Sequence, residues 1–172
     1  EKVCYVSGIN CTAPNDACEE FAAVYDLWGK PCKGRVCYHG YQSFREGEVT
    51  AEKAHEIGVK LAERLWGDRF QVVVATHLNT GHYHNHIMLN AISFADGYKF
   101  VNRKSDYRRM REVSDDLCRE YGISVIENPG QNSKHYGEWK AEQEGRPTQR
   151  GDIRLDLDAA IEKLGSKPTD RS

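Results

Sequence analysis

The chain has 172 residues, which corresponds to about one domain and is long enough to bury an apolar core without disulfides. Its 24 basic and 26 acidic residues give a net charge of −2, a balance that does not by itself indicate a nucleic-acid-binding protein. The sequence has no apolar run of about 18 residues and no N-terminal leader pattern, so we expect neither a membrane span nor a signal peptide.

The first half of the chain alternates strand and helix patterns. Residues 3–7 predict a short strand, and apolar residues at helical spacing predict a helix over 14–28, with Thr12 as its N-cap. Aromatic and β-branched residues predict a strand over 34–44. Thr50 caps a second predicted helix, which ends near residue 66.

The second half adds a strand pair and a third helix. Residues 69–77 predict a buried strand, and residues 82–93 predict the strand after it. A turn then leads to a short predicted strand over 98–101. Ser105 caps a third predicted helix, and residues 123–127 predict a last strand.

This order of elements predicts an α+β fold, with a central, mostly antiparallel sheet and helices packed on one face of it. The pattern lacks the strict strand–helix alternation of a doubly wound sheet. Residues 128–150 are polar and Gly-rich, and residues 153–164 predict a short helix. We expect one core domain over 1–150, followed over 151–172 by this helix and a frayed tail.

Six cysteines are present, and no two of them have the C-x-x-C spacing of a zinc ribbon. Without a signal peptide, we expect them to be reduced, as in a cytoplasmic protein.

The stretch T-H-L-N-T-G-H-Y-H-N-H-I-M-L-N at 76–90 carries most of the chemistry. Alternate side chains of a strand share a face, which places His84, His86 and Asn90 together. His77 ends the preceding strand, so an antiparallel pairing would bring it opposite His84 and His86. Three imidazoles converging in this way predict a divalent-metal site with open coordination positions.

Imidazole alone does not select the metal, and zinc and nickel are both compatible with these ligands. His82 is the additional histidine of the motif, either a ligand or a residue at the mouth of the site. We expect His82, Asn90 and His39 to support the ligands or form the rim of the site.

A basic run at 99–111 carries six cationic side chains against one acidic side chain, Asp106. Such a run is compatible both with a phosphate-binding patch and with a solvated helix face.

The histidine motif resembles the metal motif of the relaxases, which are conjugative mobilisation nucleases of the histidine-hydrophobic-histidine superfamily. The similarity to mobilisation-type relaxases of Gram-positive gut bacteria extends over residues 3–150. It is carried by C-Y-V-S-G-I-N-C at 4–11, Y-Q-S-F at 41–44, G-E-V-T-A-E-K-A-H-E-I-G at 47–58, D-G-Y-K-F at 96–100 and Y-R-R-M-R-E-V-S-D-D-L-C-R-E-Y-G at 107–122.

The resemblance implies a relaxase palm, related to ferredoxin-like sheets. It implies site- and strand-specific nicking of single-stranded DNA at a plasmid or transposon transfer origin, through a phosphotyrosine intermediate. The implied ligands are His77, His84 and His86, holding magnesium or manganese. The implied surroundings are the bacterial cytoplasm, accessory relaxosome proteins and a coupling protein. In this setting, the backbone-binding candidates are Arg103, Lys104, Arg108 and Arg109.

The chain departs from the family pattern at the nucleophile. Relaxases of this kind carry it in an N-terminal segment, a few residues before an Asn-Pro-x-Lys-Thr-like string that is absent here. Tyr5 is the tyrosine nearest the N-terminus and the weak candidate for this role. We therefore expect a fragment or processed form of a longer relaxase, in which the true nucleophile lies upstream and which binds metal and DNA without necessarily nicking.

Three alternatives remain open from the sequence. One is a non-catalytic module that binds the transfer origin. Another is a zinc hydrolase with three histidine ligands, which requires a base such as Glu46, Glu48 or Glu56. The third is a rolling-circle replication initiator, whose catalytic tyrosine would follow the histidines as Tyr107 and Tyr121 do.

Overall fold

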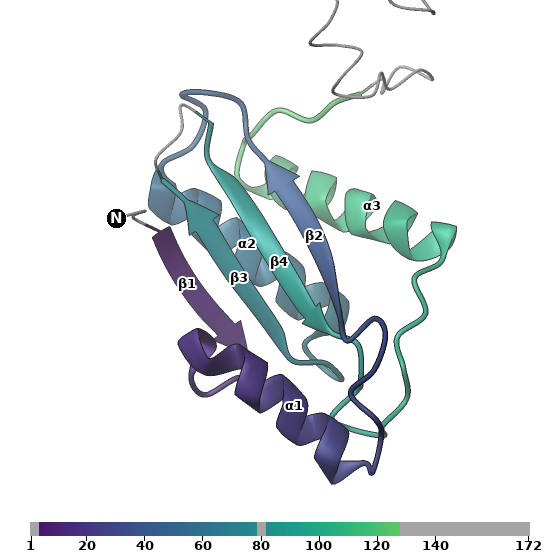
Figure 1. The fold of residues 1–172 in the computed structure, drawn as a ribbon. Coiled ribbons are helices and arrows are strands. Elements are labelled where there is room, and N and C mark those ends of the chain that lie inside the picture. Colours follow the sequence, from purple (N-terminus) through teal and green to yellow (C-terminus); the bar gives the residue numbers. More distant parts are fainter. Residues whose placement is uncertain (1–3, 79–81, 128–172) are drawn as a thin grey trace, which may run out of the picture. The chain divides into compact units, whose positions relative to one another are not determined.

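A computed structural model describes residues 4–78 and 82–127 of the chain (Figure 1), which make up nearly all of a compact unit spanning Glu1–Val125. None of the helices in this described part combines the length and apolarity that a membrane crossing requires. The elements, in chain order, are β1 (Cys4–Ile9), the 3-10 turn η1 (Pro14–Asp16), α1 (Ala17–Leu27), β2 (Cys37–Ser43), α2 (Ala51–Trp66), β3 (Val72–His77), β4 (His84–Asn90) and α3 (Lys104–Glu120).

The four strands form one antiparallel sheet in the order β1-β3-β4-β2. The two central strands, β3 and β4, follow one another in the chain, whereas the edge strands come from earlier segments. This arrangement confirms the predicted α+β fold with an antiparallel sheet.

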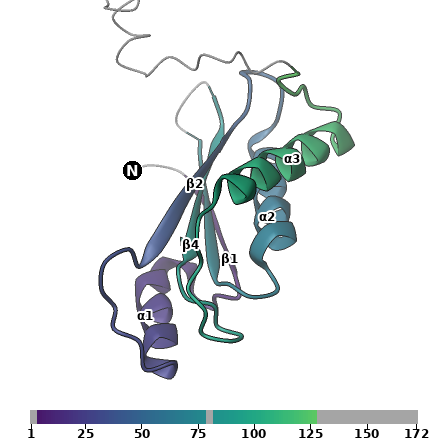
Figure 2. The same ribbon diagram turned by 90° about the vertical axis from the view of Figure 1, so that its right-hand side faces the viewer.

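Alternate residues of the central strands face opposite sides of the sheet. Val72, Val74, Ile87 and Leu89 are buried against α2, together with the apolar stripe of that helix. Figure 2 shows α2 and α3 on this side of the sheet and α1 on the other. We call the two sides the helix-covered face and the open face.

Helix α2 is the main support of the sheet. The Thr50 side chain accepts a hydrogen bond from the Lys53 backbone N–H, as expected of an N-cap. Ala54, Ile57 and Leu61 are fully buried, which confirms the predicted apolar stripe.

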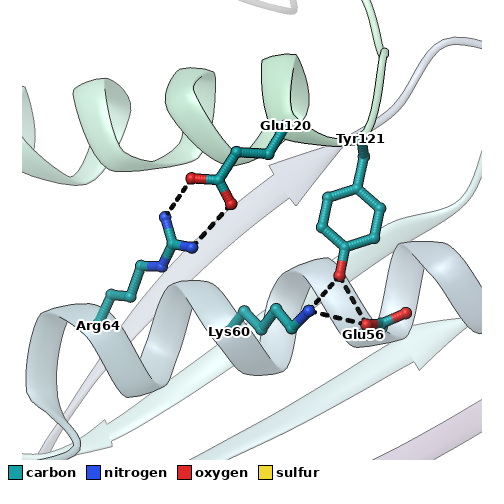
Figure 3. Close-up of polar contacts among 5 residues, drawn as sticks. All are labelled: Glu56, Lys60, Arg64, Glu120 and Tyr121. Carbon is teal, nitrogen blue, oxygen red and sulfur yellow. Dashed lines mark hydrogen bonds and ion pairs between the residues drawn. The ribbon is translucent and has the colours of Figure 1, made fainter.

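Polar contacts join α2 to the end of α3 on their exposed side (Figure 3). The Arg64 guanidinium donates two hydrogen bonds of 2.8 Å to the Glu120 carboxylate. The Tyr121 hydroxyl donates to Glu56 at 2.6 Å and accepts from Lys60. These contacts hold the last turn of α3 beside the middle of α2.

Several predicted boundaries are wrong. Thr12 does not cap α1; its hydroxyl donates instead to Glu20 at 2.8 Å, one turn inside the helix. The third helix begins one residue before Ser105, because the Asp106 carboxylate accepts from the Arg103 backbone N–H at 2.8 Å.

Two predicted strands are also wrong. In place of a strand over 98–101, the structure has an isolated bridge between Ile92 and Lys99. Residues 123–127 form no strand, although Ile123 is buried in the core. Apolar composition predicted burial correctly here but not backbone pairing. The helix predicted over 153–164 and the boundary at residue 150 lie outside the described residues.

Candidate metal centre

The β3–β4 pair brings three histidines together at one end of the open face. His77 ends β3 and lies directly opposite His84, the first residue of β4. His86 follows two residues later and therefore faces the same side as His84. The spacing of the motif and the antiparallel register thus converge on one point.

The three side chains are close enough to share an ion. One ring nitrogen from each of His77, His84 and His86 lies within 4.8 Å of the other two, and all three residues are half-buried. The Nε2 atom of His84 is 3.2 Å from Nδ1 of His77, and the ring centroids of His77 and His86 are 4.5 Å apart. Donors about 2.1 Å from one ion lie within about 4 Å of one another, so small ring rotations suffice.

The donor chemistry fits a divalent cation with open coordination positions. Three neutral imidazoles leave room for water or substrate on a four- or six-coordinate ion. Within residues 4–78 and 82–127, no carboxylate belongs to the histidine group. An ion held there would therefore keep most of its positive charge for an anionic ligand.

His82 acts on this site through its backbone. It is exposed, precedes β4, and its carbonyl oxygen lies 3.1 Å from Nδ1 of His84. Because a carbonyl oxygen only accepts, Nδ1 of His84 donates this hydrogen bond, and Nε2, which lies 3.2 Å from Nδ1 of His77, is then the acceptor nitrogen of the neutral ring.

Strand β2 contributes two side chains beside the ligands. Nε2 of His39 lies 2.8 Å from Nδ1 of His86, and the two rings stack at 5.0 Å between centroids. The Tyr41 ring centroid lies 5.4 Å from that of His84 and 5.5 Å from that of His86.

Tyr41 is not among the candidate site residues predicted from the sequence. In the structure, its side chain is 52% exposed. The available signal was its alternation with His39, two residues earlier on the same strand.

The prediction for Asn90 is wrong. It shares the alternation of His84 and His86, but it lies at the far end of β4 and is fully buried. Its amide donates to the Phe21 carbonyl of α1 and to Gln71, at 3.3 and 3.0 Å. Since α1 covers this end of the open face, Asn90 is a structural residue away from the histidines.

A chain of buried polar groups runs beneath the histidines, on the helix-covered face. The Thr76 hydroxyl donates to Oδ1 of Asn85 at 2.6 Å, and the Asn85 amide donates to Gln42 and to the Ala54 carbonyl. Gln42 donates in turn to Ser114 of α3 at 2.8 Å. These bonds tie β3, β4 and β2 to both helices directly below the site.

His55 of α2 extends this chain to β1. Because the Thr76 hydroxyl already donates to Asn85, Nδ1–H of His55 donates to Thr76 at 2.7 Å. Nε2 of His55 then accepts from the Ser7 hydroxyl at 2.8 Å. Burial lowers the pKa of His55, consistent with this neutral form.

Comparison with known proteins identifies the family. A family model described as "Relaxase: MobA/VirD2-like, nuclease domain" matches residues 1–123. The chain belongs to this family of relaxases.

Among its curated relatives are proteins named "Protein rlx" from Staphylococcus aureus. One is 34% identical over 149 residues, covering 87% of this chain and 46% of that protein. Another is 37% identical over 121 residues, covering 70% of this chain and 38% of that protein. The "Group II intron-interrupted relaxase LtrB" of Lactococcus lactis is 29% identical, covering 77% of this chain and 26% of that protein.

This relaxase domain therefore spans less than half the length of the curated relatives it matches. No solved structure matches it.

Tyr5 lies on the helix-covered face of the relaxase domain, away from the three histidines. It pairs with Thr76, and its hydroxyl donates to the Glu52 carboxylate of α2 at 3.0 Å. This hydrogen bond raises the pKa of Tyr5, which further weakens it as a nucleophile. Among residues 4–78 and 82–127, Tyr41 is the tyrosine whose ring contacts the histidine group.

The residues required by two alternative functions also lie elsewhere. Glu56 binds Tyr121 and Lys60 on the outer side of α2, and Glu48 accepts from the Ser124 backbone N–H at 2.6 Å. Tyr107 and Tyr121 lie at the two ends of α3, on the helix-covered side of the sheet. These placements disfavour Glu48 or Glu56 as the base of a zinc hydrolase and either tyrosine as an initiator nucleophile.

The basic run belongs to the start of α3. Arg103, Lys104, Arg108 and Arg109 are all exposed, so the structure leaves their cationic groups accessible to solvent. They lie on the helix-covered side of the sheet, whereas the histidines face the open side.

Proposed function

We propose that this chain is the metal- and DNA-binding part of a relaxase that cleaves and rejoins one strand of DNA at a plasmid or transposon transfer origin. The observation that supports it most directly is the group of His77, His84 and His86 on the open face of a relaxase-family sheet. We further propose that the ion is magnesium or manganese and that the substrate is single-stranded.

The histidines fix the place of the scissile phosphate. A cation bound there would neutralise charge on the phosphate oxygens. The His82 carbonyl and His39 hold the rings of His84 and His86 through their Nδ1 atoms, which keeps both Nε2 atoms directed into the site. Tyr41 offers an exposed ring beside this point, suited to stacking on a base next to the cleaved linkage.

We propose a tyrosine hydroxyl as the nucleophile. The tyrosine would give its proton to water as its oxygen bonds to phosphorus and the bond from phosphorus to the 3′ oxygen breaks, and the 3′ oxygen would take a proton from water to become a free hydroxyl. The phosphotyrosine bond retains the energy needed for rejoining. Tyr5 does not fit this step, since its hydroxyl binds Glu52 on the opposite face.

The test combines metal binding with DNA cleavage. Single-stranded oligonucleotides tiling the DNA around the encoding gene would be incubated with the chain and manganese, and covalent adducts detected on denaturing gels. Calorimetric titration with manganese would be run on the same protein and on a His84→Ala/His86→Ala variant. Tyr41→Phe and Tyr41→Ala separate a nucleophile from a stacking ring.

We expect micromolar or tighter manganese binding that the double histidine variant loses. An adduct lost in the histidine variant and kept in Tyr41→Phe would support strand transfer with stacking by Tyr41. Metal and DNA binding without an adduct would reduce the proposal to an origin-binding module. Absence of manganese binding by the unaltered chain would overturn it.

A further inference from the structure

A groove of about 600 Å³ lies on the helix-covered side, between the end of α2 and the start of α3. Its lining combines five cationic side chains and several aromatic ones with three acidic side chains, Glu63, Asp68 and Asp106. Arg103 and Arg109 come from the start of α3, Lys99 from the preceding loop, and Trp66 and Phe100 form its apolar wall. None of these residues belongs to the histidine group.

Some of the groove's cations are more available than others. Arg64 is bound to Glu120 and Arg69 to Asp96, both by charged hydrogen bonds. Lys99, Arg103 and Arg109 are exposed and line the same groove. Lys104 and Arg108 do not line the groove. Only part of the basic run therefore contributes to this concave surface.

A second cavity, of about 320 Å³, adjoins this groove. It lies between β2 and α3, and its lining includes His39 and Tyr41 of β2 and Tyr107 and Met110 of α3. The two cavities share Trp66, Phe100 and Asp106 in their walls. His39 and Tyr41 also contact the histidine group, so the β2 edge separates the metal centre from this cavity by the thickness of one strand.

The composition of this route suits single-stranded nucleic acid. Spaced cations bind successive phosphates, while exposed aromatic rings stack on bases without selecting a sequence. Tyr107 and Tyr98 are 59% and 71% exposed, and the Arg111 guanidinium lies over the Tyr107 ring. An apolar peptide would leave these cations unpaired, and duplex DNA would not offer its bases to the rings.

We propose that single-stranded DNA passes from the metal centre over the β2 edge into this groove, with Arg103 and Arg109 binding its phosphates and Tyr107 stacking on its bases. The proposal rests on the proposed function for its starting point. It adds a second, distal binding surface that holds the strand away from the point of cleavage.

The test measures binding of single-stranded oligonucleotides of increasing length by fluorescence anisotropy, over a series of salt concentrations. The variant is Arg103→Gln/Arg109→Gln. The matched control, Lys33→Gln/Arg119→Gln, removes the same charge from exposed residues outside both cavities. A Tyr107→Ala variant tests stacking, and circular dichroism verifies folding.

For long oligonucleotides, we expect the groove variant to bind at least tenfold more weakly at low salt. Its salt dependence should fall by a slope of about 1.4, because each single-strand phosphate contact contributes about 0.7. Short oligonucleotides that reach only the metal centre should bind all four proteins equally. The control should match the unaltered chain at every length.

Equal affinity of the groove variant and the control for long oligonucleotides would overturn the proposal. So would an equal loss for short and long oligonucleotides, or no binding of single strands by the unaltered chain. Manganese binding is measured separately. If the groove variant lost affinity for long oligonucleotides only, and the unaltered chain bound no manganese, the proposed DNA-binding groove would be supported and the proposed metal function would be overturned.

Discussion

The two faces of the β3–β4 pair differ although their residues alternate in the same sequence. On the open face, His77, His84 and His86 present ring nitrogens toward a common point. On the helix-covered face, Thr76 and Asn85 bond to each other and to their neighbours in a buried network. The polar residues of the two faces therefore differ in role. Those of the open face form a group suited to binding an ion, whereas those of the helix-covered face hydrogen-bond to one another inside the protein.

The first prediction sets neighbouring residues of β4 against each other. Asn85→Ala should lower the free energy of unfolding by about 2 to 5 kcal/mol, because the Thr76 hydroxyl loses its acceptor, and the Gln42 side-chain oxygen and the Ala54 carbonyl lose their donor. His84→Ala should change stability far less and abolish manganese binding. Urea denaturation in chelator measures the first effect, and calorimetric titration measures the second.

An equal loss of stability in Asn85→Ala and His84→Ala would contradict the assignment of a structural role to one face and a binding role to the other. Manganese binding by a folded Asn85→Ala variant provides the complementary check.

The second prediction concerns the close approach of α2 to this network. A Cβ atom on Gly58 would lie 2.7 Å from Cγ of Asn85 and 3.1 Å from Cγ1 of Val74. Gly58→Ala should therefore destabilise the domain by about 1 to 3 kcal/mol, despite alanine's better helix propensity. A rise in the urea midpoint, as propensity alone would give, would contradict the close packing.

The third and smallest effect is a pH dependence carried by His55. Because burial lowers its pKa in the folded state, the unfolded chain takes up this proton first as the pH falls. The stability contribution of neutral His55 is therefore intact above about pH 6.5 and declines below it. Denaturation in chelator between pH 7.5 and 5.5 should show a steeper decline for the unaltered chain than for His55→Gln. Parallel declines would assign the pH dependence to other groups.

The grouping of the three histidines could be predicted from the sequence because it depends on local geometry. Strand periodicity places His84 and His86 on one face, and a short connection places His77 opposite them. The apolar stripe of α2 was predictable for the same reason: Ala54, Ile57 and Leu61 follow helical periodicity.

The errors arise where distant segments meet. Asn90 has the alternation of a site residue, yet α1 covers its end of the strand, and no local pattern indicates where α1 packs. Tyr41 lies beside the histidines because β2 pairs with β4. The groove at Arg103 and Arg109 likewise depends on how α3 approaches the end of α2.

The central position of the β3–β4 pair also bears on how the domain folds. All three histidines of the group lie within residues 77–86, so a single hairpin closure brings them together at small entropic cost. Hairpins form in about 1 to 10 μs, whereas β1 and β2 must reach this hairpin from distant parts of the chain. If the histidines hold an ion as proposed, the hairpin alone would carry all the ligands before the sheet is complete. An ion that also binds the partly folded chain would stabilise the native domain only modestly, because a ligand stabilises the native state by its preference for it.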